Sequence, residues 1–191
     1  MIKRLSGPFD EAQVRALRAG DAVRLAGTVY TGRDRLHAFL HGGGEPPVSL
    51  RDGAIYHCGP VVVPAGGGWR VVAAGPTTSC REEPYMAGVI ARCGVRVIIG
   101  KGGMGEKTRA ACRTHGCVYL QAVGGAAASL ASRVTEARRV FFLETFGATE
   151  AMWELAVADF DAVVGMDTHG ASLFEDIRQT SEARLASLIG R

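Results

Sequence analysis

Residues 71–81 of the chain read VVAAGPTTSCR. The apolar run at the start of this segment predicts a buried strand, and Gly75-Pro76 ends that strand at once. Two threonines, a serine and an arginine follow, where a helix from about Glu82 to Cys93 is predicted to begin. A strand that opens into a turn with hydroxyl and cationic side chains is a common anion site in open α/β sheets.

A second predicted strand ends with similar chemistry. Val95–Ile99 is apolar throughout most of its length, and Gly100-Lys101-Gly102-Gly103 follows it. Because the carboxyl ends of parallel strands lie at one edge of a sheet, we expect the polar side chains at these two ends to share one anion-binding pocket. Its expected members are Thr77, Thr78, Arg81 and Lys101. The alternative is that the threonines only cap a helix and that the lysine points to solvent.

The glycine-rich run at residues 100–105 does not match a nucleotide-binding motif. A Walker loop places its lysine after the second glycine, whereas Lys101 precedes most of the glycines here. The G-x-G-x-x-G pattern of dinucleotide-binding proteins does not fit either. The run therefore predicts a turn that carries one cation.

A third cluster of charged residues follows another predicted strand. Alternating apolar residues predict a strand over 21–30, and Arg33, Asp34 and His37 come directly after it. A short helix from about Asp34 to Leu40 would place Asp34 and His37 on one face. The cluster is either an ordinary surface ion pair or a functional arginine held by Asp34.

Composition limits the class of protein. The 191 residues are 47% hydrophobic and 21% charged, which predicts one domain over residues 1–191. The net charge of +3 is not gathered into a basic stripe, so we expect no nucleic-acid partner. No apolar run approaches the roughly 18 residues of a membrane span. The five cysteines form no Cys-x-x-Cys pair and predict reduced thiols, no bound metal and a cytoplasmic location.

The order of the predicted elements indicates an α/β protein. The first seventy residues are rich in strands, and strands then alternate with helices. Besides the strands at 21–30 and 95–99, we expect strands at 54–58, 71–74, 117–122, 139–143 and 162–166. Besides the helices at 34–40 and 82–93, we expect helices at 10–20, 106–115, 125–132 and 180–189.

Six motifs in this order resemble the β subunit, or C-terminal domain, of class I fumarate hydratases and of the related L-tartrate dehydratases. They are TVYTGRD at 28–34, IYHCGP at 55–60, GPTTSCR at 75–81, IGKGGM at 99–104, VGGAA at 123–127 and DTHG at 167–170. The resemblance runs from about Leu5 to Phe174. It implies a swivelling β/β/α three-layer domain.

The resemblance also implies a division of labour between two chains. In this family a 4Fe–4S cluster is bound by the α part, and the β part closes over it, so the implied partner is an α subunit in a heterotetramer of two α and two β chains. Carried over by position, Thr77 is the proposed catalytic base. Arg33, Arg81 and Lys101 bind the substrate carboxylates, Thr78 assists, and Asp34 with His37 orients Arg33.

The implied activity is the reversible hydration of fumarate to (S)-malate, a reaction of the tricarboxylic acid cycle. The alternatives are an L-tartrate dehydratase or other small-dicarboxylate hydratase β subunit, and a non-catalytic dicarboxylate-binding domain. One departure lies next to the site, since many members of the family have Met-Asp where this chain has Glu82-Glu83.

Overall fold

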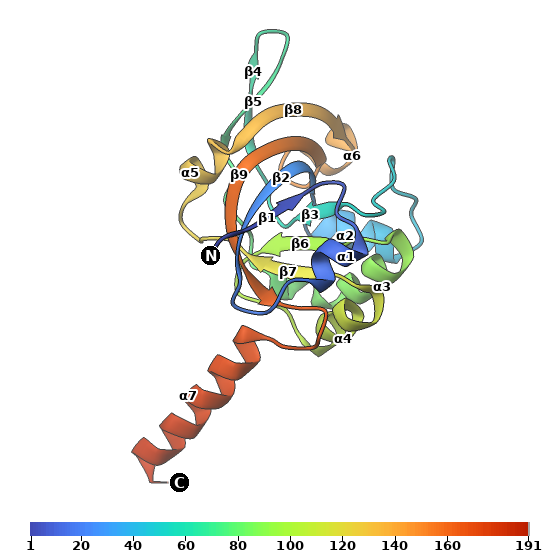
Figure 1. Ribbon diagram of the computed structural model, residues 1–191. Coiled ribbons are helices and arrows are strands. Elements are labelled where there is room, and N and C mark those ends of the chain that lie inside the picture. Colours follow the sequence, from blue (N-terminus) through green and yellow to red (C-terminus); the bar gives the residue numbers. More distant parts are fainter. Residues whose placement is uncertain (191) are drawn as a thin grey trace.

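The computed structural model describes residues 1–190 and shows a mixed α/β protein built on one continuous sheet (Figure 1). The strands are β1 (Lys3–Ser6), β2 (Ala22–Thr31), β3 (Ala54–Tyr56), β4 (Val61–Ala65), β5 (Gly68–Ala73), β6 (Val97–Gly100), β7 (Val118–Gln121), β8 (Val134–Phe141) and β9 (Met152–Met166). The helices are α1 (Glu11–Arg15), α2 (Asp34–His41), α3 (Glu83–Cys93), α4 (Glu106–His115), α5 (Ala127–Ala131), α6 (Leu143–Phe146) and α7 (Leu173–Ile189), and a 3₁₀ turn η1 (Ser79–Glu82) precedes α3. The predicted α/β class is confirmed.

The sheet closes on itself through its longest strand. β2, β3, β6 and β7 run parallel as consecutive neighbours, and the antiparallel β9 pairs with both β7 and β2. These strands therefore form a barrel-like ring, with β1 added beside β2. This closure was not predicted from the sequence. Only the last residues of β9, at 162–166, were predicted, so the sequence pattern did not reveal the strand that closes the ring.

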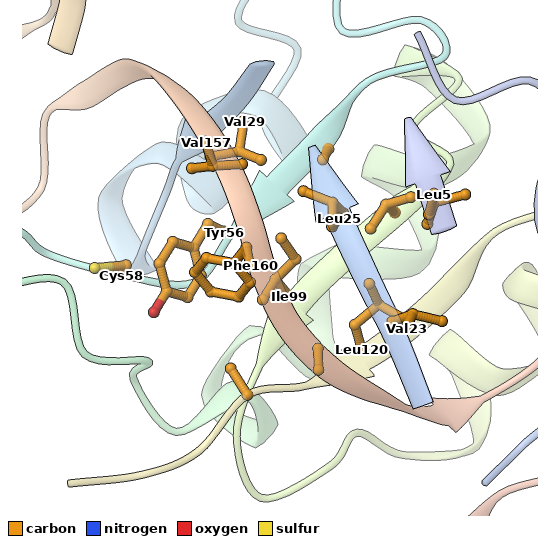
Figure 2. Packing of buried hydrophobic residues seen from close by; sticks show 14 of the residues in the cluster. Leu5, Val23, Leu25, Val29, Tyr56, Cys58, Ile99, Leu120, Val157 and Phe160 are labelled. Atoms are coloured by element: carbon orange, nitrogen blue, oxygen red, sulfur yellow. The ribbon is translucent and has the colours of Figure 1, made fainter. Parts of the chain in front are cut away.

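Because alternate side chains of a strand point to opposite faces of the sheet, the apolar side chains are divided between two cores. In β6, Val97 and Ile99 point into the ring while Ile98 faces the helices, and β7 repeats the pattern with Tyr119 facing outward. Figure 2 shows the inner core, where the rings of Tyr56 and Phe160 pack edge to face at 5.4 Å. The outer core lies beneath α2, α3 and α4, which cover one side of the parallel strands (Figure 1).

Most predicted helices and strands are confirmed, with shifted ends. Helix α4 begins and ends where predicted, and Gly116 follows it at φ +67°, a backbone conformation that favours glycine. β1 and β4 were not predicted, α1 ends earlier than expected, and α7 begins at Leu173 instead of about residue 180.

The apolar run at 71–74 is the main correction. Val71, Val72 and Ala73 are only half-buried, and they belong to β5, which forms an antiparallel hairpin with β4 and also pairs antiparallel with β8. The run is therefore not a buried strand of the parallel set. An apolar run is compatible with either location, because periodicity does not specify the neighbouring strand.

Two parts of the chain extend away from the ring. The β4–β5 hairpin and helix α7 project from opposite ends of the molecule in Figure 1. Helix α7 has no buried residue, and Ile177, Leu185 and Leu188 are exposed along it. No helix within residues 1–190 combines the length and the apolar character that a membrane crossing requires.

We predict that only the first turn of α7 contributes to stability. The ring of Phe174 lies 5.7 Å from that of Tyr119, whereas Ile177 is 64% exposed. Phe174→Ala should lower the free energy of unfolding by about 2–3 kcal/mol because it removes packed surface. Ile177→Ala should change it by less than about 0.5 kcal/mol. Urea unfolding measures both, and equal effects of the two substitutions would contradict the assignment.

Candidate functional site

The carboxyl ends of three neighbouring parallel strands build the site. Arg33 and Asp34 follow β2, His57 follows β3, and Lys101 follows β6. Residues 76–79, which lead into η1 and are called the crossing segment below, pass over these ends from outside the ring. The Thr77 amide donates to the His57 carbonyl at 2.7 Å, and the Ser79 amide donates to the Lys101 carbonyl at 2.9 Å. The predicted meeting of the two motifs is thus observed, although the first motif does not arrive from a strand of the ring.

Arg81 and Thr77 lie together on the surface of this edge. A guanidinium nitrogen of Arg81 donates to Asp34 at 2.7 Å and lies 3.4 Å from the Thr77 hydroxyl oxygen. The side chains of Arg81 and Asp34 are 44% and 45% exposed. The arginine is therefore oriented by a carboxylate while it remains open to a ligand.

Arg33 has a different acidic partner from the expected one. Its Nε lies 3.5 Å from a carboxylate oxygen of Glu150, in the loop before β9, and Asp34 instead binds Arg81. A Cβ on Gly59 would lie 2.9 Å from an Arg33 guanidinium nitrogen, so a larger residue there would displace the arginine. The expectation that Asp34 orients Arg33 is wrong. His37 does contact Arg33, through a 2.8 Å bond between its Nδ1 and the Arg33 carbonyl.

Lys101 joins the site through the backbone. Thr78 and Lys101 form an isolated parallel β-bridge, which places the two residues side by side. The aliphatic part of the Lys101 side chain lies next to Gly124, because a Cβ added to Gly124 would lie 3.4 Å from Cδ of Lys101. The structure thus brings the two residues together, and Lys101 lies beside the loop that follows β7.

A chain of buried hydroxyl and imidazole groups lies beneath the crossing segment. The Tyr119 hydroxyl donates to Ser79 Oγ at 3.0 Å, and Ser79 Oγ lies 2.9 Å from Nδ1 of His57. All three side chains are buried. Gly100 passes so close that a Cβ there would lie 1.9 Å from Ser79 Oγ. Ser79 therefore fixes the crossing segment from below.

Two ionisable side chains, Glu82 and His37, are fully buried between η1 and α2. A carboxylate oxygen of Glu82 lies 3.6 Å from Nδ1 of His37, and both residues are 0% exposed. Burial, with a smaller contribution from Asp34, raises the pKa of Glu82 to about 7. Burial lowers the pKa of His37 to about 4 and that of His57 well below its usual range. The imidazoles are therefore neutral at physiological pH.

Sequence reasoning missed several residues of this arrangement. They are His57, Ser79, Glu82, Tyr119 and Glu150. His57 and Ser79 stand inside recognised motifs, so a signal was present for them. Glu82 was noticed only because many family members have another residue at this position. No sequence signal pointed to Glu150, because the loop before β9 determines where Glu150 lies.

The arrangement suits the binding of a small dianion. Arginine and lysine side chains at the ends of neighbouring strands offer several donors to carboxylate oxygens. Within residues 1–190, no cluster of three or more His, Cys, Asp or Glu side chains is placed to hold a metal ion. Burial raises the pKa of the Cys58 thiol to about 12 and that of Cys117 well above its usual value, which makes both poor metal ligands.

We predict that Gly100→Ala destabilises the protein. The added Cβ would overlap Ser79 Oγ at 1.9 Å, and relief requires movement of the crossing segment. The free energy of unfolding should fall by about 1–3 kcal/mol, as in overpacked cores. Gly68→Ala is the matched control, because the nearest atom to its Cβ would be 3.9 Å away. A Gly100 variant as stable as the Gly68 variant would contradict the packing.

We also predict that Glu82 makes the protein less stable as the pH rises. Its folded-state pKa of about 7 lies above the usual 4.5, so the folded protein keeps a proton that the unfolded chain releases. The stabilising contribution is complete below about 4.5 and is lost as the pH rises through about 7. Glu82→Gln should therefore gain stability relative to wild type, by up to about 3 kcal/mol between about pH 5 and about pH 8. His37 titrates with the opposite sign in both proteins and cancels in this difference. A constant difference across the range would refute the prediction.

Comparison with known proteins relates this geometry to a family. The sequence model of the family described as "Fumarase C-terminus" matches residues 4–177. A Geobacillus stearothermophilus protein named as a class I fumarate hydratase is 50% identical over 95% of this chain, and the chain spans 35% of that relative. The L(+)-tartrate dehydratase subunit beta of Escherichia coli K12 is 35% identical over 92% of this chain and 88% of its own length. A Methanocaldococcus jannaschii protein named as the same subunit is 38% identical over 93% of both chains.

The match covers every strand of the ring and every residue of the candidate site. The chain therefore belongs to the fumarase C-terminus family, which includes relatives named as class I fumarate hydratase and as L(+)-tartrate dehydratase subunit beta.

Proposed function

We propose that this chain is the β subunit of an iron–sulfur-dependent hydro-lyase that reversibly hydrates fumarate to (S)-malate. The observation that carries the proposal is that Arg33 and Lys101 follow the carboxyl ends of β2 and β6, on either side of β3, with Arg81 beside Thr77. The 50% identical relative bears the fumarate hydratase name, and this supports fumarate as the substrate.

Tartrate is the second candidate substrate. The chain spans 93% and 88% of the two relatives named as tartrate dehydratase β subunits, but only about a third of the relative named as fumarate hydratase. The names of these two relatives support tartrate as a substrate and an α subunit as a partner. A dicarboxylate-binding domain without catalysis remains the third candidate, and the activity measurement below separates all three.

We assign the binding of substrate carboxylates to Arg33, Arg81 and Lys101, with Thr78 as a helper. Thr77 is the proposed group that takes the C3 proton. Its hydroxyl is a poor base alone, so it would first lose its proton to water, and the Arg81 guanidinium at 3.4 Å would stabilise the resulting alkoxide, which becomes a hydroxyl again when it takes the C3 proton. The same cations would stabilise the negative charge that develops on the substrate carboxylate. Asp34 would orient the Arg81 guanidinium by accepting its hydrogen bond, and His37 would hold the Arg33 backbone through the Arg33 carbonyl.

The cofactor and the partner belong to the same proposal. A 4Fe–4S cluster, held by the α subunit, would supply the Lewis acid for removal of the hydroxyl group. The high thiol pKa values of Cys58 and Cys117 argue against ligation of the cluster by these two cysteines. We further propose a single swivelling β/β/α domain over residues 1–191, an assembly of two α and two β chains, and a cytoplasmic location within the tricarboxylic acid cycle.

Activity should require both chains. We expect this chain alone to be inactive, and co-expression with an α-type partner, followed by anaerobic reconstitution of the cluster, to yield turnover of fumarate and malate. Preferential turnover of tartrate would instead select the second candidate. Binding of a dicarboxylate without any turnover, in the presence of an intact cluster, would select the non-catalytic domain.

Arg81→Lys should impair the reconstituted enzyme. Lysine keeps the charge but loses the planar fork that binds a carboxylate through two hydrogen bonds. We expect a loss of at least about 2 kcal/mol of transition-state binding, or roughly 30-fold in kcat/KM. Arg70→Lys is the matched control, because Arg70 is exposed on β5. Steady-state kinetics with fumarate provide the measurement, and wild-type kcat/KM in the Arg81 variant would argue against the assigned site.

A further inference from the structure

Glu82 is a buried carboxyl group without a hydrogen-bond partner, directly below the candidate site. It follows Arg81 in η1, is 0% exposed, and neither carboxyl oxygen accepts a hydrogen bond. Buried polar groups are normally satisfied, and a buried carboxylate without compensation is costly. Glu82 therefore requires an explanation other than the stability of the fold.

The neighbouring Glu83 shows what a structural carboxylate looks like in this protein. It accepts hydrogen bonds from the Gly105 and Lys107 amides at 2.8 and 3.0 Å, and from the Thr108 hydroxyl at 2.6 Å. These bonds fix the first turn of α4. Glu82 has none of these contacts although it is the adjacent residue.

Charged and titratable groups surround Glu82 on every side. Its own turn contributes Arg81, α2 contributes Asp34 and His37, the end of β2 contributes Arg33, and the loop before β9 contributes Glu150. His57 packs against His37, and the centroids of the two rings are 4.9 Å apart. Two arginines are thus already balanced by Asp34 and Glu150. An ionised Glu82 would make the group negative, whereas a protonated Glu82 leaves it neutral.

His37 cannot neutralise Glu82 by accepting its proton. Nδ1 of His37 lies 2.8 Å from the Arg33 carbonyl, so this nitrogen carries the hydrogen, and burial keeps the ring uncharged near pH 7. The state of Glu82 is therefore set by burial and by the charges above it. Its pKa of about 7 leaves both states accessible near neutral pH.

We propose that the charge state of Glu82 controls ligand binding by Arg33 and Arg81, and that a dicarboxylate binds only to the form of the protein in which Glu82 is protonated. This proposal rests on the proposed function, because it assumes a dianionic ligand on these arginines. An ionised Glu82 would repel the ligand and compete with it for the same guanidinium groups. At pH values above the pKa of Glu82, each binding event must then take one proton from the buffer onto the Glu82 carboxylate.

The pH dependence of KM for fumarate in the reconstituted complex tests this coupling. With a pKa of about 7, Glu82 is almost fully protonated at about pH 6 and about one-tenth protonated at about pH 8. The wild-type KM should therefore rise about tenfold over this range. Fumarate itself stays a dianion throughout, because ordinary carboxyl groups titrate near pH 4. Glu82→Gln and Glu82→Met hold the position uncharged and should show a nearly constant KM. Glu144→Gln is the control for removal of a carboxylate, because Glu144 is exposed on α6, and it should keep the wild-type profile.

A calorimetric measurement on the wild-type complex needs no substitution. Succinate, a saturated dicarboxylate that cannot be hydrated, should bind at about pH 8 with uptake of close to one proton, seen as a dependence of the binding heat on the buffer. Binding without proton uptake would overturn the coupling, and so would turnover with the same KM profile in wild type and both Glu82 variants. Absence of both binding and turnover at every pH would instead overturn the proposed function, and the coupling with it.

Discussion

The crossing segment of residues 76–79 holds the candidate site together, and the hydrogen bonds of Ser79 fix it in place. Its amide binds the end of β6, and its hydroxyl joins Tyr119 of β7 to His57 after β3. One small residue, through its amide and its hydroxyl, thus connects three parallel strands. Because these groups are buried, the bonds are costly to leave unmade, and the segment has one favourable register.

This anchoring explains how a segment from outside the ring supplies functional side chains to it. The β4–β5 hairpin pairs through β5 with β8, at a distance from the parallel strands along the sheet. The chain returns from the hairpin through Ala74, whose carbonyl accepts a hydrogen bond from the Tyr56 hydroxyl. The Thr77 amide then donates a hydrogen bond to the His57 carbonyl. Backbone contacts with the residues that follow β3 and β6 therefore place Thr77, Thr78 and Arg81.

The sequence was informative where local chemistry determined the structure. Gly116 marked the end of α4, and the apolar runs of β6 and β7 marked buried strands because side chains on both faces are covered. The ring itself could not be predicted, since closure depends on β9 pairing with two strands that are far away in sequence. The partners of the two arginines could not be predicted either. Asp34 was expected to bind the adjacent Arg33 but binds Arg81 of another element, and Glu150 became a site residue only through the loop before β9.

The ion pairs of the candidate site also suit the proposed arrangement, in which a partner chain completes the site. Arg81 and Asp34 are both nearly half exposed, so the attraction between them is screened by water and a ligand carboxylate can compete with it at little cost. The same pair still restricts the guanidinium to one orientation, which lowers the entropy lost when a ligand binds. A second protein surface that covered this edge would exclude water and strengthen each contact between the ligand and the cations. In the proposed assembly, the same cations would therefore bind a ligand more strongly than they do in the uncovered chain.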